Sequence, residues 1–223
     1  TTILPAGKYD VYVSRGFEYS IDLRKGFEVP AGQNVTLEAL LVHEVDTAGF
    51  ISGDFHLHAQ PSIDSSIPLQ QRVAANAAEG LEFVTSTDHD TVTNYAPFIN
   101  EMGLNHLMTS AVGVETSTLE FGHYIGFPME YDHTDLPVHD TPPWYGLSLG
   151  QVWQEMRARV QDGIDPEDFV VQINHPRDGF MAYLAQVGVT GYDMERSTPG
   201  MEMCNPQTEE IPCDFDSMEL MNE

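Results

Sequence analysis

The sequence predicts an α/β fold in which a parallel sheet closes into a barrel, preceded by a short antiparallel β segment. From residue 51 onward, short apolar strands alternate with amphipathic helical stretches, and repeated units of this kind form parallel sheets. Histidines and acidic residues follow the ends of several of these strands, where the chemistry of barrel enzymes gathers. We therefore divide the chain into a sandwich-like segment, residues 1–50, and an α/β domain, residues 51–223.

The first 50 residues contain three apolar, β-prone stretches. Residues 8–14, 18–23 and 35–43 are rich in Val, Leu and Tyr, and clusters of Gly, Pro and Asn separate them. This spacing predicts three antiparallel strands. Three strands are too few for an independent sandwich. We expect them to pack on the following domain or to continue a sheet that begins earlier.

The α/β domain is expected to contain six further strands and four helices. Pro68 in a first turn and Gly80 at a C-cap bound the first helix, and Ser148 caps a strongly amphipathic one. In chain order, the expected elements are a strand ending at 55–58, a helix at 66–80, a strand at 81–87, a helix at 97–102, strands at 107–114 and 121–127, a loop at 128–146, a helix at 148–163, a strand at 169–173, a helix near 181–187 and a last strand at 216–221.

The composition argues against several classes of function. The chain has 35 acidic residues against nine Lys and Arg, a formal charge of −26, and such a surface repels nucleic-acid backbones. No apolar run approaches the ~18 residues of a membrane span, and no signal peptide is evident. Cys204 and Cys213 lack zinc-ribbon spacing and are able to close a short disulfide loop. The sequence does not fix the oligomeric state. It does not fix the compartment either, although it favours secretion or a periplasmic location.

The residues from Gly53 to Asp90 carry the strongest metal-binding pattern. On an extended segment the side chains of His56 and His58 point to the same face and form half of a metal site. Other potential ligands fall at or just after expected strand ends, with His123 inside its strand; these are Asp88, His89, Glu115 and His175. We therefore expect one shared site. His106, His133 and His139 lie outside these patterns and are interpreted as loop histidines.

These motifs resemble the PHP (polymerase and histidinol phosphatase) superfamily of metallohydrolases. The resemblance covers about residues 51 to 223. Asp64 occupies a metal-facing position where many relatives carry His. The matching motifs are His56-x-His58, Thr87-Asp88-His89, Gly113-Val114-Glu115, His123 in Phe-Gly-His, and Asn174-His175-Pro176. Within the superfamily the chain looks most like the carbaryl-hydrolase-like (CehA/McbA) branch, whose members often carry a β-sandwich segment ahead of the barrel.

The resemblance implies a distorted (β/α)7 TIM-like barrel that is incomplete at its C-terminal end. The family's last barrel strand carries an Asp-x-His ligand pair, whereas residues 215–222 look like the strand just before it. The chain also opens with Thr1 rather than Met. We expect it to be a piece of a longer protein.

The resemblance also implies two or three divalent metal ions, zinc, manganese or iron. Glu115 would bridge two of them, with His56 and His58 on the first and His123 and His175 on the second. Asp64 and His89 would hold a third ion or hydrogen-bond to the other ligands. A hydroxide held between two such ions attacks phosphorus and carbonyl centres alike.

Three further residues receive catalytic roles. Asp88 or Asp90 is expected to orient His89 or to accept a proton. Arg177 either meets an anionic group of a small-molecule substrate or forms a structural salt bridge. The leading function is phosphoester hydrolysis, and amide or carbamate ester hydrolysis is the runner-up. A metal-binding or carbohydrate-binding module without catalysis, and a purely structural fragment, remain alternatives.

Overall fold

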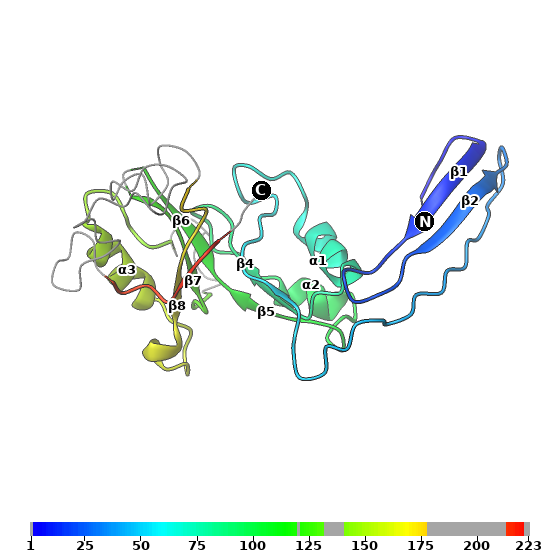
Figure 1. Ribbon diagram of the computed structural model, residues 1–223. Helices are drawn as coiled ribbons and strands as arrows, with labels where there is room; N and C mark the ends of the chain where they lie inside the picture. The colour runs from blue at the N-terminus through cyan, green and yellow to red at the C-terminus, as the bar shows by residue number, and fades with distance from the viewer. Residues whose placement is uncertain (1, 120, 132–140, 178–212, 221–223) are drawn as a thin grey trace, which may run out of the picture.

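In a computed structural model, residues 2–119, 121–131, 141–177 and 213–220 are described. Their strands form three small sheets that follow one another along an elongated molecule, with the first sheet projecting as an arm (Figure 1). The described elements are β1 Gly7–Val13, β2 Asp22–Val29, β3 Gly53–Asp54, α1 Leu69–Ala78, β4 Phe83–Ser86, α2 Ala96–Glu101, β5 Thr109–Val112, β6 Val114–Thr118, β7 Gly122–Phe127, α3 Leu149–Arg157, the 3₁₀ helix η2 Pro166–Asp168, β8 Val170–Ile173 and β9 Ser217–Met218.

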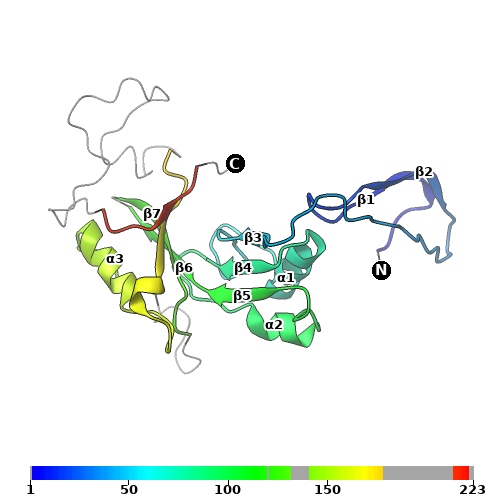
Figure 2. The same cartoon turned by 60° about the horizontal axis from the view of Figure 1, so that its bottom comes forward.

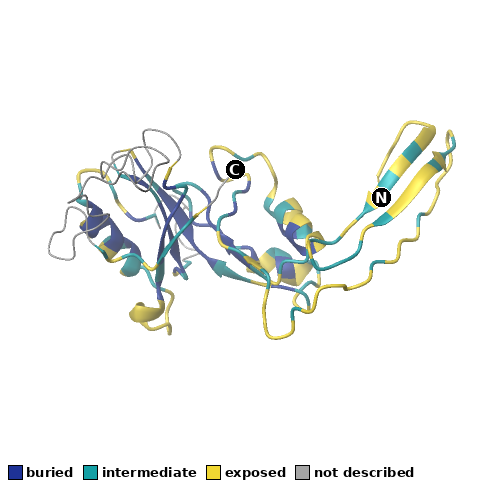
Figure 3. Cartoon of the chain, in the orientation of Figure 1, coloured by how far each residue is buried: buried dark blue, intermediate teal, exposed yellow. Residues whose placement is uncertain are grey.

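The arm is an antiparallel pair, β1 and β2, that stands away from the rest of the described chain (Figures 1 and 2). The third strand expected at 35–43 does not form, and in place of a regular strand pairing this stretch has an isolated bridge between Tyr19 and His43. A side chain accepts a backbone hydrogen bond that a strand partner would otherwise accept. The amide N–H of Leu40 donates to Asp22 Oδ2 at 3.1 Å. Much of the arm is exposed (Figure 3).

The central sheet has the order β3-β4-β5, and all its strands are parallel. Helix α1 connects β3 to β4, and α2 connects β4 to β5. Both helices pack against the sheet through a core that contains Val73, Val84, Tyr95 and Ile99. Gly80, at φ +79°, ends α1 in the left-handed conformation, as the sequence predicted. This βαβαβ unit is the part of the chain that matches the expected alternation of strands and helices.

The third sheet has the order β6-β7-β8-β9 and is mostly antiparallel. Its core lies under α3, where the fully buried Trp153 packs edge-on against Tyr124 with ring centroids 5.5 Å apart. The capping box at Ser148 is present, with Gln151 at the third position. Helix α3 ends at Arg157 rather than at Gly163, because the chain then turns to form a bridge with the segment after β7.

The expectation of a closed barrel is wrong for the described chain, which forms open sheets. Only three residues, 119–121, join β6 to β7, and a connection this short can only make an antiparallel hairpin. A barrel of parallel strands needs a helical crossover at that point. The single strand expected at 107–114 is instead two strands, β5 and β6, which separate at Gly113 and belong to different sheets.

The central and third sheets meet at one backbone bridge. Residue His89, just after β4, pairs with Glu115 of β6, and the amide N–H of Glu115 donates to Asp88 O at 3.2 Å. The amide N–H of Asp90 donates in turn to Glu115 O at 2.9 Å. The seam between the two sheets therefore passes through the residues on which the metal-site prediction rests.

The C-terminal part of the chain returns to this seam. The last strand expected at 216–221 is present as the short β9, parallel to β8. Cys213 is disulfide-bonded, whereas Cys204 and the helix expected near 181–187 lie outside the described residues. Among the described helices, none has the length and apolar character needed to cross a membrane.

Gly113 has no room for a side chain, and Gly113→Ala is expected to destabilise the fold. A Cβ atom there would lie 2.8 Å from Gly126 O and 3.0 Å from Thr85 Cγ2. Overpacking of this kind costs about 1–3 kcal/mol. The free energy of unfolding, measured by urea denaturation, should fall by that amount, while Gln154→Ala on the exposed face of α3 leaves it nearly unchanged. Equal stability of the two variants would contradict this account of the seam.

Candidate metal centre

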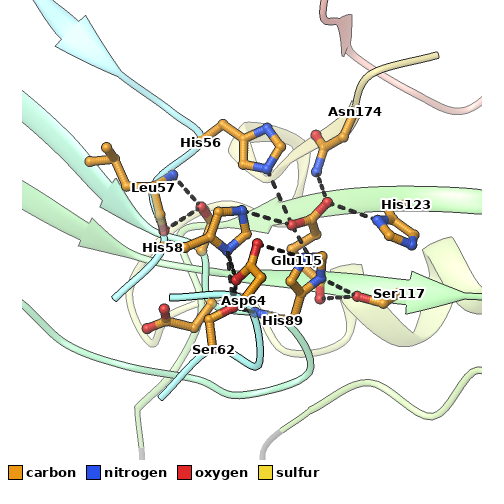
Figure 4. Close-up of polar contacts among 12 residues, drawn as sticks. His56, Leu57, His58, Ser62, Asp64, His89, Glu115, Ser117, His123 and Asn174 are labelled. Carbon is orange, nitrogen blue, oxygen red and sulfur yellow. Dashed lines mark hydrogen bonds and ion pairs between the residues drawn. The ribbon is translucent and has the colours of Figure 1, made fainter. Parts of the chain in front are cut away.

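Glu115 is the central residue of the site. It lies on β6 with its side chain fully buried, and one of its oxygens, Oε2, faces three histidines (Figure 4). The distances from Oε2 are 3.2 Å to His56 Nε2, 3.1 Å to His58 Nε2 and 3.3 Å to His89 Nδ1. These three histidines follow the ends of β3 and β4, so the central sheet supplies this side of the carboxylate.

The other oxygen, Oε1, faces a second set of nitrogens. Asn174 Nδ2 donates to it at 2.9 Å, and His123 Nδ1 and His175 Nε2 each lie 3.2 Å away. His123 belongs to β7, whereas Asn174 and His175 follow β8. The third sheet therefore supplies this side, and the carboxylate stands between two groups of ligands from two sheets.

The five imidazole rings form a closed series around Glu115, which we call the histidine circle. Successive ring centroids lie 4.7 to 5.8 Å apart, and the last ring returns to the first. The circle runs through His56, His58, His89, His123 and His175. All the histidines predicted as metal ligands therefore meet at one place, whereas His106 is exposed in a loop and bonds to Gly103 O.

Thr87, just after β4, fixes the segment that carries the first two histidines. The hydroxyl of Thr87 bonds to both the N–H and the carbonyl of Leu57, at 2.7 and 3.0 Å. Because Leu57 is held against β4 in this way, its neighbours His56 and His58 turn to the opposite side and reach the same oxygen of Glu115. The same-face geometry inferred from the His-x-His spacing is present.

Asp88 and Asp90 hold the backbone of the site. Asp88 is fully buried, its Oδ1 accepts from Ala59 N at 2.5 Å, and its Oδ2 accepts from Thr93 Oγ1 at 2.6 Å. Burial raises the pKa of this carboxyl, although both hydrogen bonds oppose the shift. Asp90 adopts φ +46° and accepts from Ser117 N at 3.1 Å. Through these hydrogen bonds, Asp88 and Asp90 position the loops that carry the histidines.

Asp64 lies at the solvent side of the centre. Its carboxylate is half exposed, 3.5 Å from His89 Nε2 and 3.8 Å from His58 Nδ1. Ser62 Oγ donates to it at 2.7 Å and also accepts from His89 N at 3.1 Å. Arg177 is exposed just beyond His175, and its contact with a substrate stays a prediction.

Electrostatics divide the histidine circle. Burial would raise the pKa of Glu115, but hydrogen bonds with four of the histidines lower it far below its usual range. Burial lowers the pKa of His56, yet the carboxylates of Glu115 and Glu219 raise it overall from 6.5 to about 10. The pKa of His175 is raised by Glu115 against the opposing effect of burial, whereas burial lowers that of His89. The carboxylates thus favour a proton on His56 and on His175, and a cation at the centre would replace it.

Among the described residues, three groups of side chains have ligand atoms close enough to hold a metal ion. Within each group the atoms lie within 4.8 Å of one another, and Glu115 takes part in two of the three. The groups are His56 with His58 and Glu115, His58 with Asp64 and His89, and His89 with Glu115 and His123. Imidazole nitrogens mixed with carboxylate oxygens suit zinc, manganese and iron. The buried His and Glu side chains can therefore hold a metal ion.

Several residues at the centre were not predicted from the sequence. In the sequence, Asn174 is matched only as part of a motif, and Glu219 falls only within the last expected strand. Ser62 and Ser117 carry no sequence signal, although Ser117 Oγ lies 2.6 Å from His89 Nδ1. The chain matches no family model and no curated protein.

Metal binding is expected to release protons, because His56 must give up its Nε2 proton to bind a cation. With its pKa raised from 6.5 to about 10, that proton stabilises the metal-free fold fully below pH 6.5, and the contribution is lost as the pH rises through about 10. Metal affinity should therefore increase from pH 7 to pH 8, by about tenfold for one released proton. Calorimetric titration with Mn²⁺ in two buffers of different ionisation enthalpy measures the release. Binding with no proton release would contradict it.

Proposed function

We propose that this chain is a metal-dependent hydrolase that binds two or three divalent ions, zinc, manganese or iron, around Glu115. The observation that carries the proposal is the arrangement of the carboxylate, whose two oxygens face two separate sets of histidines at 3.1 to 3.3 Å. A carboxylate that faces ligands on both sides is suited to bridging two cations.

The donor set fits metal ions better than it fits a hydrogen-bonded core. A buried carboxylate accepts only a few hydrogen bonds, and five protonated imidazoles would place far more positive charge around Glu115 than one carboxylate balances. Neutral imidazoles are able to donate one N–H each, but about four acceptor positions face six nitrogens, that of Asn174 included. A ring left without an acceptor turns its lone pair to the carboxylate, and the two repel unless a cation lies between them. Metal ions at this place would satisfy both the imidazole lone pairs and the carboxylate.

The resemblance to the PHP superfamily supplies the residues that would hold these ions, and the contacts of Glu115 with both pairs of histidines support it. His56 and His58 would bind the first ion and His123 and His175 the second, with Glu115 between them. Asp64 and His89 would hold a third ion at the solvent side. Divalent ions in such a site lower the pKa of water to near neutrality and polarise an ester. Around them, Asn174, Ser62 and Ser117 fix the carboxylate and the rings, and the half-exposed Asp64 marks the side open to solvent.

We infer that phosphoesters are the substrates, with amide or carbamate esters as the second candidate. The resemblance of the motifs to the PHP superfamily, and to its carbaryl-hydrolase-like branch, supports these two classes. Arg177, exposed close to His175, is suited to an anionic substrate group. The proposal depends on the side chains around Glu115 and not on a barrel.

Metal content tests the proposal first. Plasma mass spectrometry of the protein purified with metal supplied should find two or three equivalents. His58→Ala should lose at least one equivalent, because the ring contacts Glu115 and is near Asp64. His106→Ala removes an exposed loop histidine and serves as the matched control, with unchanged content.

Turnover tests the chemistry. The metal-loaded chain should hydrolyse bis(p-nitrophenyl) phosphate or an aryl carbamate, and Glu115→Gln should lower kcat by more than the ~10–100-fold typical of outer-sphere changes. If the chain takes up metal but hydrolyses neither phosphoesters nor carbamates, it is a metal-binding module without catalysis. A folded chain that takes up no metal would overturn the proposal.

A further inference from the structure

The residue after β9 reaches the histidine circle from the far end of the sequence. Glu219 is anchored by its amide N–H, which donates to Ile173 O at 2.9 Å beside β8. Its side chain is largely buried, and its two carboxylate oxygens contact two different histidines. Glu219 is separated from the nearer of these, His175, by 44 positions in the sequence, and from His56 by 163.

One oxygen of Glu219 acts on the ring of His56. Oε1 lies 2.7 Å from His56 Nδ1, on the side of the ring opposite Nε2, which faces Glu115 at 3.2 Å. A carboxylate only accepts hydrogen bonds, so it requires the proton to be on Nδ1. The lone pair of a neutral His56 is then on Nε2 and points at the centre.

The other oxygen acts on the backbone of His175. Oε2 accepts from His175 N at 2.7 Å. His175 adopts φ +24°, a conformation that is costly for a residue with a side chain and persists only where the surroundings hold it. Glu219 thus fixes one ligand through its ring and another through its main chain, on opposite sides of Glu115.

We propose that Glu219 is a positioning residue that sets the tautomer of His56 and the backbone of His175 so that both present Nε2 to the metal centre. This inference rests on the centre proposed above and names a residue that the motifs of the sequence left without an assigned role. Glu219 itself binds no ion in this arrangement, because both oxygens are engaged by the two histidines.

The two oxygens make Glu219→Gln an informative variant. Glutamine has one carbonyl oxygen and one NH₂ group, and the His175 N–H always requires an acceptor. The carbonyl therefore stays with His175, and the NH₂ group donates to His56 Nδ1. That contact moves the ring proton to Nε2, where it blocks metal binding. The substitution Glu219→Gln, which hardly changes the size of the side chain, would thus prevent His56 from binding the metal.

A merely structural role predicts a different order of effects. If Glu219 only filled space at the end of β9, Glu219→Gln would behave like the wild type and Glu219→Ala would be the damaging change. If it positions His56, Glu219→Gln weakens metal binding at least as much as Glu219→Ala, because alanine leaves the ring free to adopt either tautomer. Glu219→Asp retains the charge and should restore part of the affinity.

The experiment is a Co²⁺ titration followed by visible absorption for the wild type and the three variants. Glu82→Gln is the matched control, since Glu82 also accepts a backbone N–H, from Ser52 at 3.0 Å, and its loss changes the net charge equally. Affinity should fall by about 10–100-fold in Glu219→Gln and stay unchanged in Glu82→Gln. Long-range ¹⁵N–¹H spectra of the zinc-loaded wild type should show His56 protonated on Nδ1.

The outcomes separate this inference from the proposed function. Wild-type affinity in Glu219→Gln, or a zinc-loaded wild type with His56 protonated on Nε2, overturns the role of Glu219 and leaves the metal centre intact. The spectrum of the wild type decides the question even if a variant does not fold. A wild-type chain that binds neither Co²⁺ nor Zn²⁺ overturns the proposed function and this inference with it.

Discussion

The burial of the Glu115 carboxylate is the constraint on which the rest of the site depends. A carboxylate with no exposure to solvent needs donors or cations on every side, and the fold brings them from four strands and the loops that follow them. The central sheet delivers His56, His58 and His89, and the third sheet delivers the opposite set. The bridge between His89 and Glu115 joins the two sheets at this point, so the seam of the fold and the centre of the site coincide.

The gathering of the histidines was predictable because its signals are local. Two histidines separated by one residue share a face of an extended segment, and residues just after strand ends gather where neighbouring strands end together. Both rules hold for His56, His58 and His89. The amphipathic period after Ser148 and the cap at Gly80 are equally local, and the corresponding helices are present. Each of these features depends on spacing within a few residues.

The fold class was not predictable from the same signals, because strand direction is not encoded in the apolar period. The stretches expected as strands at 107–114 and 121–127 are β-prone whether they pair in parallel or not. The three-residue connection between β6 and β7 decides that these two strands form an antiparallel hairpin. The contacts of Asn174 and Glu219 with the centre likewise depend on distant segments meeting, and no spacing within the sequence indicates them.

The central claim is that Glu115 stands between metal ions, and anomalous scattering from Mn²⁺-soaked crystals tests it most directly. The account predicts two anomalous peaks on opposite sides of the Glu115 carboxylate, about 3.5–4 Å apart, as in other two-metal hydrolytic sites. One peak should lie beside His56 and His58, and the other beside His123 and His175. Mn²⁺ bound only at the acidic surface, with no peak within reach of Glu115, would contradict the account.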